Sequence, residues 1–427
     1  MKYVEAIEFL YGLRLFGAKF GLENTRKLAA LAGNPQNHLH FIHVAGTNGK
    51  GSTCAMLEAI YRAAGLRTGL FTSPHLVSFR ERLQINRQLI TEEEVVELVE
   101  EIIPLLKDFP AGHHPTFFEV VTVMALRHFA RNHCELVIWE TGLGGRLDAT
   151  NIVTPLASLI TNIALDHTQW LGDTLARIAA EKAGIIKPGV PILTTTDEPE
   201  ALAVIQQVAR THRAPFRHIG PSARVGADTP LPALPGEHQR RNAALALATI
   251  QVLHPIVPVP PEAIRTGLAG VAWPGRLQTL ELSGNRCLLL DGAHNPAGVA
   301  TLCAALQNRP RNDRPALIFG ALEDKKWPEI CHLLAPLSDR IHVVPVASER
   351  SANPRELADA FRAARPDARV LAWPDLRSAL IACQEETCTI VTGSLYLVGE
   401  ALELAGHSPA GTGERGLNDW TWSLADK

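Results

Sequence analysis

The stretch that decides the fold is FIHVAGTNGKGST, residues 41–53. Phe41–Ala45 is a short apolar run of the kind found in buried strands. The glycine-rich loop after it leads into Cys54–Ala64, whose apolar spacing is typical of a helix. In such a loop, glycines let backbone N–H groups converge on phosphate oxygens, and the helix N-terminus adds partial positive charge. The stretch therefore predicts a phosphate-binding loop between a strand and a helix.

Lys50 can reach the β- and γ-phosphates of a nucleotide, and the hydroxyl of Ser52 or Thr53 can meet Mg²⁺. The loop departs from the common G-x-x-x-x-G-K-[ST] pattern, because Val44 replaces the first glycine and Gly51 separates Lys50 from Ser52. The strand–loop–helix order favours nucleotide binding over a glycine-rich turn without a ligand. The residues predicted to bind ATP here are Asn48, Gly49, Lys50, Gly51, Ser52 and Thr53.

Strand-like and helix-like segments alternate on both sides of this loop. The expected strands are 41–45, 69–72, 136–140, 156–161, 191–194, 277–282, 287–290, 316–319, 341–344 and 389–392. The expected helices are 54–64, 91–106, 117–132, 175–183, 239–253, 327–334 and 354–364. This alternation predicts an α/β fold with a mostly parallel sheet and helices on both of its faces.

The length of 427 residues suggests two or three domains at roughly 100–200 residues each. A Pro-rich interval, Pro255–Pro261, interrupts the helical pattern, and the alternation restarts after two further strands. We expect the boundary near residues 280–288, with an ATP-binding domain over 1–284 and a smaller α/β domain over 285–405. The remaining tail, 406–427, is rich in Gly, Ser and Pro and is expected to be flexible.

The composition argues against several classes of protein. Hydrophobic residues make up 46% and charged residues 20%, which is ordinary for a globular chain. The net charge of −3 gives no overall basic footprint for nucleic acid or an anionic membrane. The sequence has no apolar run of the roughly 18 residues needed to span a membrane, and Met1–Leu10 lacks the apolar core of a signal peptide. The seven cysteines form no C-x-x-C pair, so no zinc knuckle or disulfide framework is expected. The expected location is the cytoplasm.

Acidic and histidine side chains supply candidate metal ligands. Glu140 ends the apolar strand Leu136–Glu140, at the sheet edge where parallel sheets bind ligands, and Mg²⁺ prefers oxygen ligands. A solvated acid at a strand end is an equally weighted alternative. The loop Gly142–Asn151 is either a structural turn or a substrate-binding loop. By spacing alone, His167 is more often a core or surface residue than a ligand.

Together these segments resemble the folylpolyglutamate synthase and dihydrofolate synthase family, a branch of the Mur ligase superfamily. The resemblance extends to about residue 404 and rests on nine segments occurring in order: 43–53, 71–76, 116–119, 140–151, 164–167, 181–187, 274–276, 291–296 and 392–396. One departure is Trp139-Glu140-Thr141, since an aliphatic and a small apolar residue are more usual around this acid. The resemblance implies a P-loop Mur-ligase-like ATPase domain, a smaller C-terminal Rossmann-like domain, and an active site between them.

The resemblance also implies roles for single residues. Ser73, Glu140 and His167 correspond to magnesium ligands, and Lys182 to a lysine that is carbamylated in family members. A free lysine is a cation and cannot bind Mg²⁺, whereas its carbamate offers oxygen ligands. Without the resemblance, Lys182 is better interpreted as a helix-surface lysine.

The remaining roles that the resemblance implies concern nucleotide, substrate and catalysis. ATP-contacting positions are Asn242, Arg276 and Asp291. The substrate positions are Phe117, Phe118, Arg146, Asp148 and Ser394. The positions expected to be catalytic are Lys50, His167, Lys182, Asp291 and His294.

The implied activity is ATP-dependent ligation of L-glutamate to folates, and also to dihydropteroate, through an acyl phosphate with two Mg²⁺ ions. The first alternative is another Mur-type amide ligase, which the Gly142–Asn151 loop and Thr116–Glu119 disfavour. The second is a P-loop ATPase switch, which would not need the motif around Asp291. The family is usually monomeric, and neither nucleic acid nor a membrane is an expected partner.

Overall fold

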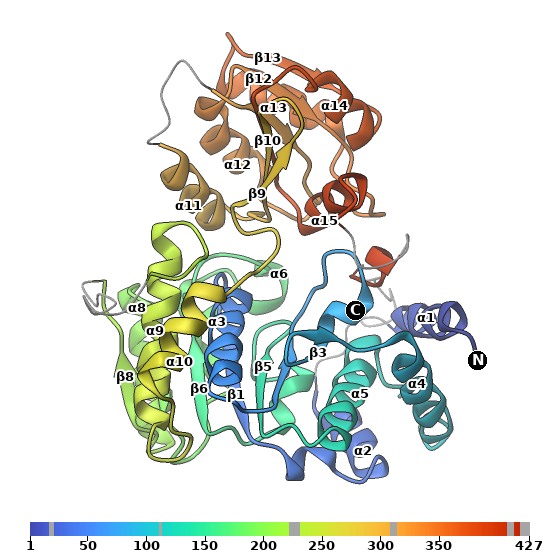
Figure 1. Cartoon of the computed structure of the whole chain (residues 1–427), viewed down its shortest axis with the longest axis vertical. Helices are drawn as coiled ribbons and strands as arrows, with labels where there is room; N and C mark the ends of the chain where they lie inside the picture. The colour runs from blue at the N-terminus through green and yellow to red at the C-terminus, as the bar shows by residue number, and fades with distance from the viewer. Residues whose placement is uncertain (17–20, 111–112, 222–230, 308–313, 408–413, 419–427) are drawn as a thin grey trace.

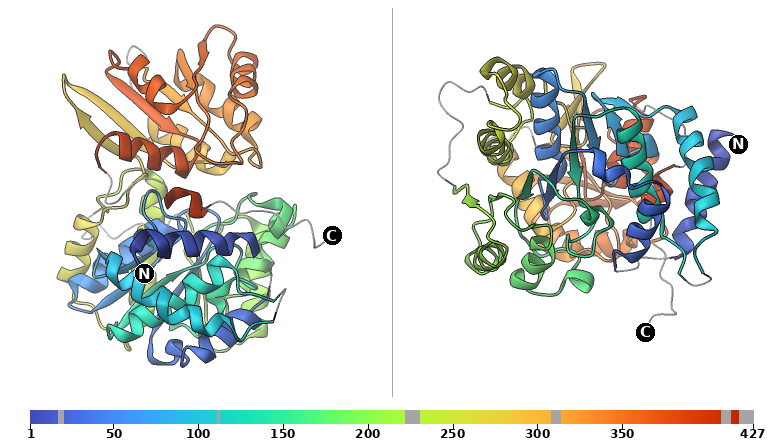
Figure 2. Two further views of the ribbon diagram at one scale, coloured as in Figure 1. Left: turned by 90° about the vertical axis from the view of Figure 1, so that its right-hand side faces the viewer. Right: turned by 90° about the horizontal axis from the view of Figure 1, so that it is seen from below.

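Two α/β lobes are stacked along the long axis of the molecule (Figure 1). The computed structural model describes residues 1–427 except 17–20, 111–112, 222–230, 308–313, 408–413 and 419–427. Each lobe is built on its own sheet, with helices on both faces. The chain enters the second lobe once, after α10 (Pro261–Gly270), and its described C-terminal segment returns to the first lobe (Figure 2).

The first lobe contains an eight-stranded sheet in the order β4-β3-β2-β5-β1-β6-β7-β8. Six neighbouring strands run parallel to one another: β2, β5, β1, β6, β7 and β8. At the β2 edge, β3 and β4 continue the sheet with antiparallel pairing. The bounds are β1 Phe41–Ala45, β2 Thr68–Phe71, β3 Leu83–Ile85, β4 Gln88–Leu89, β5 Leu136–Glu140, β6 Ala157–Ile160, β7 Ile192–Thr194 and β8 Phe216–His218. Every β1 residue is buried, because this central strand is covered on both faces.

Helices cover both faces of this sheet. They are α1 Tyr3–Gly12, α2 Glu23–Leu31, α3 Lys50–Ala63, α4 Glu92–Leu106, α5 Phe117–Arg131, α6 Thr168–Leu171, α7 Leu175–Ala183, α8 Pro199–Thr211, α9 Glu237–Leu253 and α10, with 3₁₀ turns η1 Leu13–Phe16, η2 Pro35–His38, η3 Phe79–Arg82 and η4 Ala149–Ile152. Successive β1 side chains alternate between the faces. Phe41 belongs to the apolar cluster that also contains residues of α1, α2, α4 and α5, whereas Ile42 and Val44 belong to the cluster with residues of α3, α9 and α10.

The second lobe contains a six-stranded sheet in the order β13-β12-β11-β14-β10-β9, parallel except for β9. Its strands are β9 Gln278–Leu282, β10 Arg286–Asp291, β11 Ala316–Phe319, β12 Arg340–Val343, β13 Arg369–Ala372 and β14 Cys388–Thr392. Its helices are α11 Pro296–Leu306, α12 Trp327–Leu334, α13 Pro354–Ala364, α14 Leu376–Ala382 and α15 Leu395–Leu404, with the 3₁₀ turn η6 Ala335–Leu337. Separate apolar clusters fill its two faces.

The predicted fold class is confirmed, and the predicted strands 41–45, 136–140 and 316–319 coincide with β1, β5 and β11. The sequence pattern does not predict helix α10, because its first residue, Pro261, belongs to the Pro-rich interval that interrupts the helical pattern. Proline suits the first helical position, where its missing N–H would have no partner within the helix.

The predicted domain boundary differs from the observed sheets. Strand β9 begins at Gln278 and pairs with β10, so the second sheet starts before residue 285. We propose that the domains divide between α10 and β9.

The predicted flexible tail, 406–427, is described only in part. Within it, η7 Glu414–Asn418 packs on the first lobe with Glu414, Leu417 and Asn418 buried, so this part of the tail is ordered. Residues 408–413 and 419–427 lie outside the described residues.

The structure describes all seven cysteines; none of them forms a disulfide, and five are buried. In the part of the chain that the structure describes, none of the helices is both long and apolar enough to cross a bilayer.

Candidate active site

A cavity of about 670 Å³ lies between the two lobes. The first lobe contributes the loops after β1, β2, β5 and β6, at the carboxyl ends of its parallel strands. The second lobe contributes Arg276, the turn after β10 and the start of α15. Parallel sheets bind ligands at this edge, so the fold itself places the candidate site here.

The predicted phosphate loop connects β1 to α3 and forms one wall of the cavity. Gly49 precedes the helix with φ of +85°, a conformation that favours glycine. A side chain at Gly46 would overlap Thr161, because an added Cβ would lie 1.8 Å from the Thr161 hydroxyl. A hydrogen bond also holds the loop in place, because the side-chain oxygen of Asn162 accepts the backbone N–H of Asn48 at 2.7 Å. The loop is therefore rigidly formed by its neighbours, with its helix N-terminus open to the cavity.

Two lysines converge on this loop. The Nζ of Lys50 donates to the carbonyl of Gly46 at 3.2 Å, and the Nζ of Lys182 donates to the same carbonyl at 2.8 Å. Lys182 comes from α7 and is buried, which contradicts its interpretation as a helix-surface residue. Burial, and then the charge of Lys50, lower the pKa of Lys182 to about 7. A large fraction of this amine is therefore neutral near pH 7.

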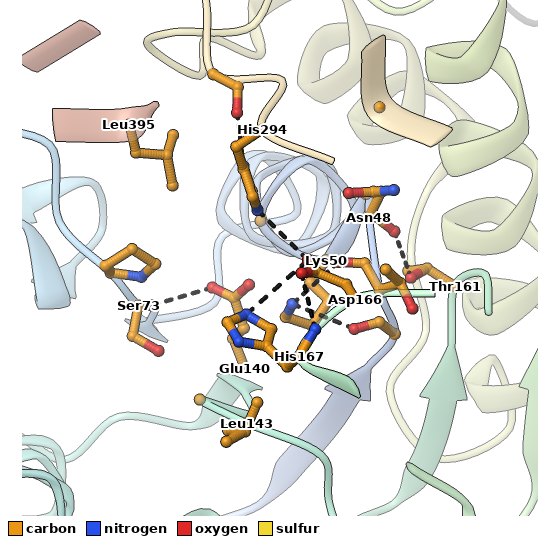
Figure 3. Close-up of a pocket in the computed structure, with 18 of the residues that line it drawn as sticks. Asn48, Lys50, Ser73, Glu140, Leu143, Thr161, Asp166, His167, His294 and Leu395 are labelled. Atoms are coloured by element: carbon orange, nitrogen blue, oxygen red, sulfur yellow. Dashed lines mark hydrogen bonds and ion pairs between the residues drawn. The ribbon is translucent and has the colours of Figure 1, made fainter. Parts of the chain in front are cut away.

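Glu140 ends β5 inside the cavity wall, with Ser73 beside it (Figure 3). Its carboxylate accepts the backbone N–H of Ser73 at 3.1 Å. Glu140 is buried, so the solvated-acid alternative is contradicted. Burial raises the pKa of Glu140 to about 7, although the nearby charge of Lys50 opposes this rise. The Oγ of Ser73 is buried and has no hydrogen-bond partner within the described chain.

These two residues fit a magnesium ion. Proteins bind Mg²⁺ through one or two carboxylates together with substrate phosphates and waters. Glu140 offers a carboxylate, and Ser73 offers a buried hydroxyl that lacks a partner. The described residues include no group of three or more His, Cys, Asp or Glu side chains placed to hold a metal. A site that is completed by nucleotide phosphates needs no such group.

A second ion at His167 and Lys182 fits less directly. The Nε2 of His167 lies 3.4 Å from the Nζ of Lys325, which is a cation already facing this nitrogen. Burial lowers the pKa of His167 to about 3, so the ring is neutral. A metal ion at His167 therefore requires Lys325 to withdraw and Lys182 to carry an oxygen ligand.

Asp166 joins the two lobes (Figure 3). Its carboxylate accepts from Lys325 at 2.8 Å and from Asn295 at 3.0 Å, and lies 3.6 Å from the Nε2 of His294. These three partners all belong to the second lobe. Burial opposes ionisation of Asp166, but the contact with His294 and the charge of Lys325 hold its pKa well below the ordinary value. Asn295 also exchanges hydrogen bonds with Asn48 of the phosphate loop, at 3.0 and 3.2 Å.

The expected nucleotide-binding side chains are linked to one another. Ser52 accepts from Gln239 at 3.2 Å, and Gln239 in turn accepts from Asn242 at 2.9 Å. This chain connects the phosphate loop to α9. On the second lobe, Asp291 accepts two backbone N–H groups at 2.9 Å each, and this fixes the turn that faces Arg276.

Four of the five residues expected to bind substrate line the cavity, but one of these four has its carboxylate engaged within its own loop. Phe117 and Phe118 line the cavity at the start of α5, and Ser394 lines it at the start of α15. Asp148 also lines it, but its carboxylate is buried and accepts the N–H groups of Leu143 and Thr150, so it organises its own loop.

Two predicted residues, Arg146 and Thr53, do not reach the cavity. The guanidinium of Arg146 pairs with Glu181 at 2.8 Å on the outer side of the loop. Thr53 is fully buried in α3 and does not line the cavity, and its hydroxyl has no hydrogen-bond partner within the described residues. The other predicted site residues line the cavity: Asn48, Gly49, Lys50, Gly51, Ser52, Ser73, Phe117, Phe118, Glu140, Asp148, His167, Lys182, Asn242, Arg276, Asp291, His294 and Ser394.

Sequence reasoning gave no role to Asp166, Asn295, Lys325 or Arg82, which also lie at this site. Asp166 and Asn295 lie inside two of the segments that carry the family resemblance, 164–167 and 291–296. The signal for Lys325 is its place in a charged run, 323–326, shortly after an apolar strand. Arg82 has no comparable local signal.

Two family models match the chain. The Mur ligase middle domain matches residues 44–223, and the Mur ligase, glutamate ligase domain matches residues 275–395. A dihydrofolate synthase/folylpolyglutamate synthase from Bacillus subtilis is 36% identical, over 93% of this chain and 98% of its own length.

Solved structures agree with this similarity. Mycobacterium tuberculosis folylpolyglutamate synthase, complexed with ADP and AMPPCP, has a TM-score of 0.88 and 30% identity, covering 96% of this chain and 100% of its own. Escherichia coli FolC in complex with DHPP and ADP has a TM-score of 0.84 and 30% identity, covering 95% of this chain and 98% of its own. The cavity lies between the two regions that the domain models match. The chain therefore belongs to the folylpolyglutamate synthase/dihydrofolate synthase family of Mur ligases.

Proposed function

We propose that this protein is an ATP-dependent ligase that joins L-glutamate to folates, and that it also glutamylates dihydropteroate. The observation that carries this proposal is the composition of the cavity between the lobes. A phosphate loop, a buried acid with an unpartnered serine hydroxyl, and two phenylalanines face the same space. The relatives named for both activities support the dual assignment.

The chemistry must activate a carboxylate toward an amine. The acceptor carboxylate attacks the γ-phosphorus of ATP, the bond to the β,γ-bridging oxygen breaks, and ADP leaves an acyl phosphate. The neutral amine of glutamate then attacks the carbonyl carbon, loses a proton, and expels phosphate to form the amide. Water would destroy the acyl phosphate, so the reaction needs an enclosed site.

The chain supplies positive charge where the phosphoryl group is transferred. The ammonium of Lys50 and the N–H groups at the start of α3 face the cavity beside Glu140. Such preorganised donors stabilise negative charge that develops on transferring phosphoryl oxygens. Mg²⁺, when bound by Glu140 and Ser73, would neutralise further phosphate charge. Phe117 and Phe118 supply an aromatic wall for the flat pterin ring.

Glu140→Gln is expected to remove the stabilisation of the protein by Mg²⁺. The side-chain amide of glutamine has no negative charge and only one oxygen, whereas the carboxylate of Glu140 offers Mg²⁺ a negative charge and two oxygens. A ligand at 100 times its dissociation constant stabilises the native state by about 2.7 kcal/mol. We therefore expect Mg²⁺ to raise the thermal midpoint of the wild-type protein with AMPPCP, and to leave that of Glu140→Gln unchanged. Exposed Glu97→Gln is the control. If Mg²⁺ raised the thermal midpoint of Glu140→Gln as much as that of Glu97→Gln, the assignment of Glu140 as a magnesium ligand would be contradicted.

Lys182→Ala is expected to lose most of the ligation activity, and short carboxylates such as acetate should restore part of it. A neutral amine reacts with CO₂ to give a carbamate and a proton, and the lowered pKa of Lys182 supplies that neutral amine. NMR of protein equilibrated with ¹³C-bicarbonate should show a carbamate carbon that is absent from Lys182→Ala. Full activity of the variant without additives would refute the role.

A paired assay tests the function itself. Dihydropteroate and tetrahydrofolate are each incubated with ATP, Mg²⁺ and L-glutamate, and the products are identified by mass. Both acceptors should gain one glutamyl unit per ADP released. ATP hydrolysis that does not depend on acceptor and glutamate would favour the ATPase switch. Turnover of a UDP-muramoyl acceptor alone would favour another Mur-type ligase.

A further inference from the structure

Arg82 is a buried cation in the cavity wall that forms no ion pair with a described carboxylate, although the more distant charges of Glu81 and Glu140 raise its pKa. It ends η3, is 3% exposed, and its guanidinium carbon lies 5.4 Å from the centre of the Phe117 ring. Among the described residues, no Asp or Glu oxygen comes within ion-pair distance of it. Burial lowers the pKa of Arg82 to about 10, so the group is still positively charged near neutral pH. A buried charge of this kind is costly unless an anion pairs with it.

Neutral partners hold two of its three nitrogens. The Nε of Arg82 donates to the Nδ1 of His75 at 2.9 Å, and Nη2 donates to the side-chain oxygen of Asn418 at 2.5 Å. His75 accepts through Nδ1 and is therefore protonated on Nε2, which donates to the carbonyl of Glu414 at 2.9 Å. In the described structure, Nη1 has no hydrogen-bond acceptor. One nitrogen of a fixed, charged guanidinium, Nη1, is thus left for a group in the cavity.

The C-terminal segment η7 supplies this fixation. Asn418 also donates to the carbonyl of His75 at 2.9 Å, and the carboxylate of Glu414 accepts from Ser78 at 2.9 Å and from the backbone N–H of Phe79 at 2.6 Å. Leu417 is 1% exposed and packs in the core of the first lobe. In Figure 1 this segment, in red, lies next to α1 below α15. A segment that follows the second lobe in sequence thereby completes the wall of the cavity in the first.

We propose that Arg82, oriented by His75 and Asn418, binds the non-reacting α-carboxylate of a glutamyl-terminated acceptor. This inference rests on the proposed function and names the part of the acceptor that the residue recognises. A folate presents one carboxylate to ATP and carries a second, whereas dihydropteroate has only the reacting one. A charged guanidinium with Nη1 still able to donate suits a carboxylate, and such charge-assisted hydrogen bonds are strong. Arg82 therefore favours folates as acceptors over dihydropteroate, and His75 and Asn418 are positioning residues.

The test compares two ligands that differ only in this carboxylate. Tetrahydrofolate and its analogue with γ-aminobutyrate in place of glutamate share the pterin and the reacting carboxylate. Their dissociation constants are measured by calorimetry in the presence of AMPPCP and Mg²⁺. We expect the wild-type protein to bind the folate on the order of 10–100-fold more tightly than the analogue. Arg82→Met should bring this ratio close to one.

Two further variants distinguish a loss of carboxylate binding from a general disturbance of the fold. Asn418→Ala should lower the ratio several-fold because Arg82 loses one of its two fixed partners, and this variant decides the question if Arg82→Met does not fold. Arg80→Met is the matched control, since Arg80 lies in the same 3₁₀ turn but does not line the cavity. It should keep the wild-type ratio.

An unchanged ratio in Arg82→Met, or equal weakening of both ligands, would overturn the inference. Binding is measured without turnover, so this outcome is distinct from failure of the proposed function. That failure would appear as a wild-type protein that forms no glutamylated product in the paired assay.

Discussion

Lys50→Ala is expected to abolish ligation while the protein stays folded. Lys50 is the first residue of α3 and lines the cavity where the terminal phosphates of ATP would lie. Removing a preorganised charge of this kind from a phosphoryl-transfer site costs on the order of 10³-fold or more in kcat. The measurement is kcat with tetrahydrofolate, ATP and L-glutamate at saturation.

The fold should survive because Lys50 forms no ion pair with any described side chain, and Glu140 feels its charge only at a distance. Its ammonium donates to two backbone carbonyls of its own loop, those of Gly46 and Thr47. We expect the free energy of unfolding, measured by urea denaturation, to change little. Lys107→Ala, which removes an exposed lysine of the same lobe, is the matched control and should keep full activity. Turnover at the wild-type rate in Lys50→Ala would refute the phosphate-loop assignment.

Asp166→Asn is expected to uncouple ATP hydrolysis from ligation. The carboxylate of Asp166 joins Lys325 and His294 of the second lobe to the wall of the first. The amide keeps the size of the side chain but loses the charge that faces Lys325, whose side chain is only 7% exposed. Lobes that no longer align well would let water reach the acyl phosphate, and misplacement by about 1 Å costs on the order of 10²-fold.

The readout is the number of ADP molecules released for each glutamyl product. The wild-type ratio should be near one, and that of Asp166→Asn should rise, while kcat for ligation falls on the order of 10²-fold. Binding of AMPPCP should change less, because the phosphate loop belongs to the first lobe. Asp173→Asn, at an exposed acid close by in sequence, should behave like the wild-type protein. A variant with low kcat but unchanged coupling would mean that Asp166 has no role in alignment.

Local patterns were sufficient for much of the fold. The continuous apolar runs of β1 and β5 follow from strands that are buried on both faces, and the amphipathic spacing of α7 and α13 follows from helices with one exposed face. Patterns failed where a proline lies at a helix start, as at Pro261 in α10, and where only strand pairing assigns a segment, as for β9. Pairing joins residues far apart in sequence, and no local signal encodes it.

The sequence alone determined the phosphate loop, the α/β class and the residues that correspond to a known family, because each of these depends on neighbouring residues in the chain. Only the tertiary structure decided which side chains meet. It buried Lys182 against Gly46, turned Arg146 outward to Glu181, and brought Asn418 to Arg82 across 336 positions. The physical reason is that burial and charge pairing depend on distances in space, which a folded chain sets through packing between elements remote in sequence.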